Sequence, residues 1–95
     1  DKSLEPPIIE YLLQQNYPNP FNTLTTINYE IPFQANVTLK LYDILGREVS
    51  ILVNEQKPAG RYKVDFAENN LSSGVYFYTL RTDNFSQTNK MNMLK

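Results

Sequence analysis

The chain of 95 residues carries nine basic and ten acidic side chains, a net charge of −1, and neither cysteine nor histidine. Disulfides, zinc sites built on cysteine or histidine, and catalysis by a thiol or an imidazole are therefore excluded. Proteins that bind nucleic acid or anionic lipid normally carry a basic surplus, so neither partner is expected. The hydrophobic share of 41% and the aromatic share of 13% are sufficient for one modest core.

The first ten residues, DKSLEPPIIE, differ from the rest of the chain because they contain two adjacent prolines and no alternation of apolar and polar residues. This composition is typical of a linker, so we expect residues 1–10 to join an upstream domain to a domain at 11–95. The stretch is too charged for a signal peptide. No run in the chain approaches the roughly 20 apolar residues of a membrane span, so no direct membrane insertion is expected.

Apolar and polar residues alternate with a period of two along almost all of residues 11–95, which is the pattern of half-buried strands. In RYKVDF, for example, Tyr62, Val64 and Phe66 share one face. The alternation and the turn residues that interrupt it predict seven strands, near residues 11–15, 24–31, 36–43, 47–53, 60–66, 74–82 and 85–94. The fold class is therefore all-β, and a seven-stranded immunoglobulin-like antiparallel β-sandwich is expected.

The inward faces of these strands predict the residues of the core, namely Leu13, Ile27, Tyr29, Ile31, Val37, Leu39, Leu41, Val49, Ile51, Val53, Tyr62, Val64, Phe66, Tyr76, Tyr78, Leu80, Met91 and Met93. In GVYFYTLRT both faces carry apolar groups, and this assignment leaves Val75 and Phe77 facing outward. Either a neighbouring loop covers these two side chains, or they form a small contact patch.

The hexapeptide NYPNPF, residues 16–21, cannot be a helix interior or a central strand, because proline lacks a backbone donor and has a fixed φ. We expect a stiff loop at one end of the sandwich, in which Asn16 and Asn19 hydrogen-bond the loop backbone. In this interpretation Tyr17 and Phe21 lie over the open end of the core.

A second motif, DILG at residues 43–46, predicts a tight hairpin turn. Gly46 supplies a positive φ there, and the Asp43 carboxylate accepts hydrogen bonds from turn amides.

The sequence predicts no catalytic site, no metal site and no cofactor. Its carboxylates fall on predicted turns or outward faces, without the spacing of a glycosidase or a metal site: Asp43, Glu48, Asp65, Glu68 and Asp83. Ser72 and Ser73 lack a histidine as base, and each of the three glycines stands alone, so there is no glycine-rich phosphate loop. The domain is therefore not expected to be an enzyme.

Several segments, in this order and spacing, carry a family resemblance: LLQQNYPNPFN, LYDILGREVSILV, AGRYKVDF, LSSGVYFYTL and NKMNMLK. From Tyr11 to Lys95 the chain resembles the type A C-terminal sorting domain of type IX secretion cargo, also called the Por secretion system C-terminal domain. One departure is Thr23, since the family usually has a proline after PNPFN. This difference loosens the loop slightly.

The resemblance implies a non-catalytic secretion signal. Cargo of this kind crosses the inner membrane with a separate N-terminal signal, passes through the periplasm, and is carried across the outer membrane by the type IX translocon and its shuttle proteins. It ends at the cell surface or outside the cell, after a sortase-like peptidase cuts in or before residues 1–10. The family's motifs map onto Pro18, Asn19, Pro20, Phe21, Gly46, Arg47, Glu48, Gly74, Tyr76, Lys90 and Lys95. For most of these residues a role in folding competes with contact to a receptor.

Two other functions remain open at this point. One is a FlgD-like immunoglobulin-fold structural spacer that carries no address. The other is a carbohydrate-binding sandwich module, for which the candidate exposed aromatics are Phe33, Tyr42 and Phe77.

Overall fold

The structure is a computed structural model that describes residues 6–67 and 70–94. These residues contain seven strands: β1 (Leu12–Leu13), β2 (Thr25–Ile31), β3 (Ala35–Tyr42), β4 (Glu48–Lys57), β5 (Gly60–Phe66), β6 (Gly74–Thr82) and β7 (Phe85–Met93). All seven were predicted, although β1 is shorter than expected and β4 continues to Lys57. Glu68, Lys95 and the first half of the expected linker, residues 1–5, lie outside the described residues.

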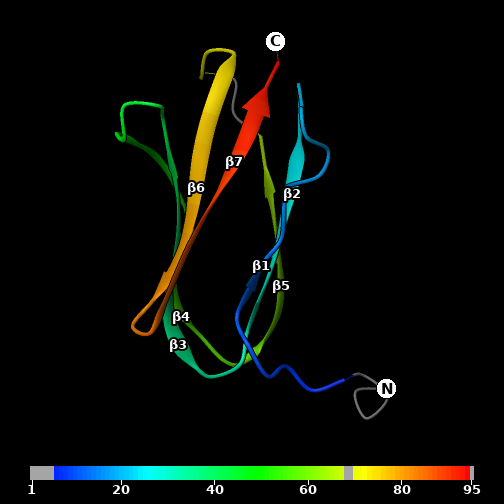
Figure 1. Cartoon of the computed structure of the whole chain (residues 1–95), viewed down its shortest axis with the longest axis vertical. Coiled ribbons are helices and arrows are strands. Elements are labelled where there is room, and N and C mark those ends of the chain that lie inside the picture. The colour runs from blue at the N-terminus through cyan, green and yellow to red at the C-terminus, as the bar shows by residue number, and fades with distance from the viewer. Residues whose placement is uncertain (1–5, 68–69, 95) are drawn as a thin grey trace.

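The strands form two antiparallel sheets that pack face to face (Figure 1). One sheet has the order β1-β2-β5 and the other the order β4-β3-β6-β7. The chain changes sheet between β2 and β3, between β4 and β5, and between β5 and β6. The alternating pattern of each strand therefore directs one set of side chains into the space between the sheets, which confirms the all-β sandwich.

The core between the sheets consists largely of the predicted residues. Its buried apolar side chains are Leu13, Phe21, Ile27, Tyr29, Ile31, Val37, Leu39, Leu41, Phe66, Tyr76, Tyr78, Leu80, Met91 and Met93. The predicted core residues Val49, Val53, Tyr62 and Val64 are only partly buried and pack against this cluster. Val75 and Phe77 are half-buried and alternate with buried residues of β6, as the predicted outward face requires.

The prediction for Ile51 is wrong, because the β3–β4 ladder contains two irregularities. Leu39 pairs with Val53 while Lys40 pairs with Ile51, so Leu52 is an extra residue on β4. A bulge of this kind shifts the alternation of the strand by one residue. Ile51 is consequently 51% exposed, and Leu52 packs against the core in its place.

The segment from β1 to β2 is tied to the opposite sheet by side-chain hydrogen bonds. The Tyr78 hydroxyl donates to the Gln14 carbonyl and accepts from the Asn16 amide, both at 2.8 Å. The Gln87 and Asn89 side-chain amides donate to the carbonyl of Leu13, at 3.2 and 3.3 Å. These bonds close one side of the sandwich and bring the Asn16–Phe21 loop to the outer edge of β7.

Phe21 completes the core at this side. Its ring is 3% exposed and packs edge-on against Phe66, with ring centroids 6.2 Å apart. Tyr17, in contrast, is 79% exposed, so the prediction that its ring also covers the core is wrong. The reason is a two-way backbone pairing of Tyr17 with Thr26, which holds Tyr17 as a strand-like bridge next to the buried Asn16. Neighbouring side chains of such a segment point to opposite sides.

Replacing Phe21 by alanine should lower the free energy of unfolding by about 2–4 kcal/mol, through lost apolar burial and the cavity left behind. Chemical denaturation of the purified domain measures this change. Tyr17→Ala in the same loop is the matched control and should cost no more than about 0.5 kcal/mol. Equal effects of the two substitutions would contradict the assignment of Phe21 to the core.

Candidate functional site

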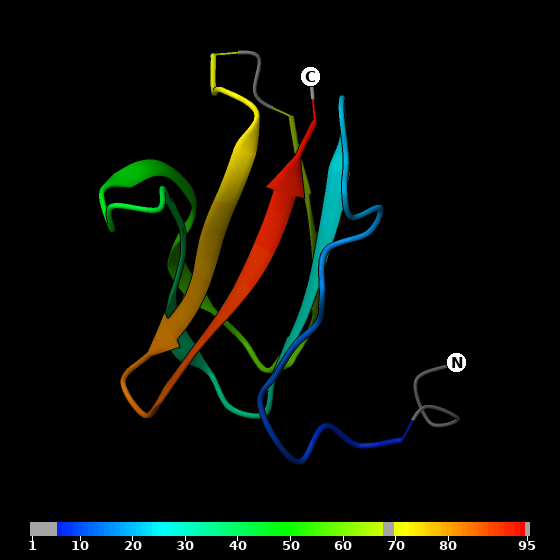
Figure 2. The same ribbon diagram turned by 45° about the horizontal axis from the view of Figure 1, so that its top comes forward.

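Most of the predicted site residues lie at one end of the sandwich. This end, called the motif end below, comprises the Asn16–Phe21 loop, the Asp43–Arg47 turn, Gly74 at the start of β6 and Met93 at the end of β7. Both views show these parts near the end where β7 finishes, whereas residues 6–10 lie at the opposite end (Figures 1 and 2).

The Asn16–Phe21 loop lies along the outer edge of β7. Asn19 accepts a hydrogen bond from the Asn92 amide through its side-chain Oδ1 (2.8 Å). The Phe21 amide donates to the Asn92 carbonyl (3.1 Å), and the Leu94 amide donates to the Phe21 carbonyl (2.8 Å). Phe21 thereby forms a parallel bridge with Met93. The prediction that Asn19 bonds the loop's own backbone is therefore wrong, since its partner is the backbone of the terminal strand.

Asn16 does bond the loop backbone, as predicted. Its side-chain amide donates to the Pro18 carbonyl (3.3 Å) and to the Thr25 hydroxyl (2.9 Å). The Thr25 hydroxyl in turn donates to the Pro18 carbonyl (2.9 Å). The peptide bonds that precede Pro18 and Pro20 are both cis. The Pro18 carbonyl accepts both the Asn16 and the Thr25 hydrogen bonds, while the Pro18 residue is otherwise exposed.

A shallow apolar groove of about 410 Å³ lies beside this loop. It is lined by Pro20, Ser73, Gly74, Val75, Asn92, Met93 and Leu94. The groove brings together Pro20 and Gly74, two predicted site residues that are far apart in the sequence. Gly74 has φ +147°, and a Cβ there would meet no atom within 4 Å, so glycine is favoured by the backbone conformation and not by close packing.

The Asp43–Arg47 turn is held by the Asp43 carboxylate, as predicted. Oδ1 accepts from the Leu45 and Arg47 amides at 2.9 and 3.0 Å, and Oδ2 accepts from Arg47 Nε at 2.8 Å. Gly46 has the predicted positive φ of +82°. Glu48 is the first residue of β4 and is exposed. Its carboxylate forms an ion pair with Lys40 on the neighbouring strand β3 (3.1 Å).

The hydrogen bond from the Arg47 amide holds the pKa of Asp43 below its ordinary value. Desolvation is the second-largest effect and opposes this shift, while the Arg47 side chain and the Leu45 amide add to it. Because these donors stabilise the carboxylate form, the negative charge at Asp43 is part of the folded turn.

The remaining predicted residues lie deeper or apart from the motif end. Tyr76 is buried, and its hydroxyl donates to the Ser72 carbonyl at 2.7 Å, which indicates a structural role. Lys90 is exposed and lies inside β7, opposite Phe77. The prediction for Lys95 falls on a residue outside those described.

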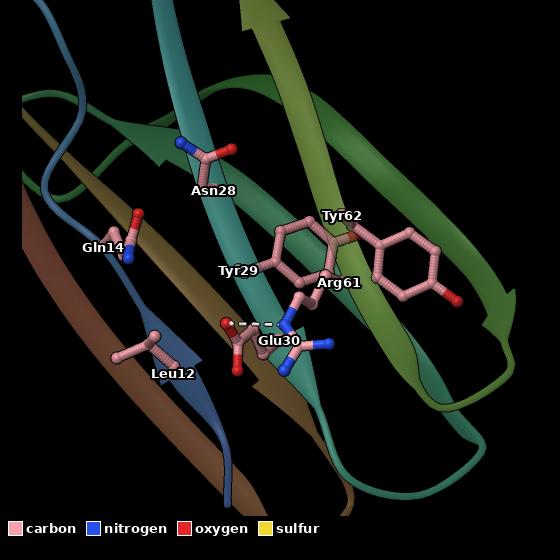
Figure 3. Close-up of a pocket in the computed structure, with 7 residues that line it drawn as sticks. All are labelled: Leu12, Gln14, Asn28, Tyr29, Glu30, Arg61 and Tyr62. Carbon is pink, nitrogen blue, oxygen red and sulfur yellow. Dashed lines mark ion pairs between the residues drawn. The ribbon is translucent and has the colours of Figure 1, made fainter. Parts of the chain in front are cut away.

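A second pocket, of about 220 Å³, contains none of the predicted site residues. Leu12, Gln14, Asn28, Tyr29, Glu30, Arg61 and Tyr62 line it on the β1-β2-β5 sheet (Figure 3). Glu30 and Arg61 form an ion pair across it at 3.4 Å, and Arg61 also donates to the Pro6 carbonyl at 2.8 Å. These contacts hold residue 6 against the sheet, at the end opposite the motif end.

The buried Tyr29 provides no acid–base chemistry. Burial, with smaller effects of Tyr62 and Glu55, raises the pKa of Tyr29 to about 12, so its hydroxyl stays protonated at neutral pH. Across residues 6–67 and 70–94, no cluster of three or more acidic, histidine or cysteine side chains could hold a metal ion. The same residues contain no helix of the length and hydrophobicity needed to cross a membrane.

The low pKa of Asp43 predicts a pH-dependent contribution to stability. The pKa is lower in the folded state than in the unfolded state, so the stabilisation is complete above about pH 4 and is lost as the pH falls through the folded pKa. The melting temperature of the native domain should exceed that of Asp43→Asn at neutral pH, and the difference should shrink below pH 4. A difference that stays constant down to pH 2 would contradict the prediction.

Comparison with known protein families matches residues 15–93 to the secretion system C-terminal sorting domain. The match includes the loop and the turn of the motif end and all residues that line the groove except Leu94. No curated protein and no solved structure matches the chain. Members of this family are non-catalytic in general and interact with the type IX secretion machinery. Their presence implies that the protein is exported to the cell surface or the extracellular space. The chain belongs to the secretion system C-terminal sorting domain family and is a sorting signal for type IX secretion.

Proposed function

We propose that the domain is a non-catalytic, immunoglobulin-like address label whose motif end is read by the type IX translocon and its shuttle proteins. The observation that supports this proposal is the gathering of family-motif residues at one end of the sandwich, with residues 6–10 at the other (Figure 1). A cargo joined through residues 1–10 therefore leaves the motif end uncovered.

The contacts at the motif end favour recognition of a folded surface. Pro20 and Gly74 line the apolar groove together with the end of β7, with which Phe21 pairs. Backbone hydrogen bonds and the buried Phe21 ring hold the groove in one conformation before any partner binds. A preformed surface of this kind loses little conformational entropy on binding.

The route and the processing step follow from the family. We propose that a separate N-terminal signal brings the cargo into the periplasm, where the domain folds and engages the translocon. A sortase-like peptidase then cuts in or before residues 1–10. The exposure of Pro6, Pro7, Ile9 and Glu10 supports access of a peptidase to this segment.

Neither alternative function is supported by a specific observation. A carbohydrate-binding module needs a row of exposed aromatics. Tyr42 and Phe77 are neighbours across β3 and β6, but both are half-buried rather than exposed. Phe33 is exposed, but it lies in the connection between β2 and β3, outside both strands. A structural spacer is distinguished from an address label by export alone.

The proposal is tested by fusing residues 1–95 to a reporter that reaches the periplasm of a type IX-competent cell. We expect the reporter outside the cell or on its surface, and retention of the same reporter without the domain. A fusion that folds but stays in the periplasm would contradict the proposal and favour a structural spacer.

The terminal strand should matter for export in two separable ways. Deletion of residues 91–95 should abolish export, because it removes the buried Met91 and Met93 from the core. Replacement of Lys90 and Lys95 by glutamine should leave the melting temperature nearly unchanged, because Lys90 is exposed and an exposed charge adds little stability. The same replacement should slow export if these lysines steer the domain to an acidic receptor surface. Full export of the double glutamine variant, beside failed export of the deletion, would limit the strand's role to folding.

A further inference from the structure

The turn between β3 and β4 presents two consecutive aliphatic side chains to solvent. Ile44 is 68% exposed and Leu45 is 72% exposed. Single exposed aliphatics are common on protein surfaces, but hairpin tips normally carry small or polar residues. The β6–β7 hairpin of the same domain follows that rule, with Asp83 and Asn84 at its tip. The apolar tip therefore needs an explanation that turn geometry does not supply.

The pair is held rigidly from below. Besides the three hydrogen bonds that the Asp43 carboxylate accepts, the Asp43 amide donates to the Arg47 carbonyl and the Gly46 amide donates to the Asp43 carbonyl, both at 3.0 Å. The positive φ of Gly46 closes the turn. Ile44 and Leu45 are thus fixed on a preformed backbone, and a partner that buries them loses little entropy in ordering it.

The charges around the pair are neutralised locally. Arg47 pairs with Asp43 at 2.8 Å, and Lys40 pairs with Glu48 at 3.1 Å. The turn therefore presents no basic cluster of the kind that binds anionic lipid or nucleic acid. A convex, uncharged, aliphatic tip is complementary to a concave apolar pocket on a protein.

The position of the turn makes it accessible during recognition. It lies at the motif end, away from residues 6–10, and projects beyond the edge of its sheet in both views (Figures 1 and 2). A protein that engages the motif end can reach the tip without contact to an attached cargo.

We propose that Ile44 and Leu45 form an apolar anchor that inserts into a concave apolar pocket of a protein of the secretion machinery. This inference rests on the proposed function, because it names the contact by which the motif end is read. Asp43 and Gly46 are positioning residues in this proposal, since they hold the anchor in place and do not themselves enter the pocket.

The experiment compares export of the reporter fused to the native domain with export of an Ile44→Ser, Leu45→Ser variant. Both side chains are exposed, so the variant should keep the melting temperature of the native domain. Its export rate should fall by about tenfold or more, as expected for removal of a central anchor. Asp83→Ser, Asn84→Ser, at the polar hairpin tip, is the matched control and should be exported at the native rate.

A competition measurement tests the contact itself. The isolated domain, produced in the periplasm without a reporter, should slow export of the native fusion by occupying the same pocket. The Ile44→Ser, Leu45→Ser domain should not compete, and Asp43→Ala, which keeps both aliphatics on a looser turn, should compete less than the native domain.

The outcomes separate this inference from the proposed function. Retention of the native fusion in the periplasm would contradict the proposed function itself. Native export together with equal export and competition by the serine variant would overturn the anchor and leave the function intact. Dimerisation of the purified domain in sedimentation, or binding to vesicles that contain anionic lipid, would also overturn it if the serine substitutions abolish that association. The tip would then bind a second copy or a membrane.

Discussion

The arrangement of the motif end depends on how the unpaired backbone groups at the outer edge of β7 are hydrogen-bonded. An edge strand presents unpaired backbone groups that must be covered or they pair with other chains. Here the Asn16–Phe21 loop pairs with the backbone groups of Asn92 and Leu94 at the end of β7, although Pro18 and Pro20 have no backbone donor to offer. The Asn19 side-chain oxygen accepts from the Asn92 amide, in the place of a backbone carbonyl. The Phe21 amide then donates to the Asn92 carbonyl, and the Phe21 carbonyl accepts from the Leu94 amide. The alternation of proline with asparagine and phenylalanine is therefore suited to this edge.

A buried tyrosine helps to hold the start of the loop in place. The Tyr78 hydroxyl bonds the backbone on both sides of residue 15, and burial raises the pKa of this group, so it stays a neutral hydroxyl that both donates and accepts. Phe21 then enters the core beside Phe66, and the groove beside Pro20 is formed. The contacts that form the core and the contacts that form the groove are thus shared at Phe21.

The sequence predicted those features that depend on period and on local turn chemistry. The alternation in β2 and β5 predicts which face of each strand points to the core, because one face of each strand must be buried. The carboxylate of Asp43 and the φ of Gly46 were predictable because both act within one turn. Ile51 was not, since the bulges of β4 arise from pairing with β3. The apolar run Ile51–Val53 breaks the alternation, but the run does not indicate which of its residues faces outward. Tyr17 and Phe21 could not be told apart because the contacts that separate them come from Thr26 and β7.

The sequence names candidate site residues but does not indicate how they form a surface. Resemblance to a family selects Pro20 and Gly74, yet nothing in their spacing indicates that they meet across the end of β7. Conversely, Ile44 and Leu45 are ordinary apolar residues in the sequence, and only their exposure on a rigid turn distinguishes them. A groove and a protruding tip at the same end would let one partner read two separate features of the folded domain. Because both exist only on the assembled sandwich, such a partner would discriminate folded domains from unfolded ones, whatever cargo is attached at the opposite end.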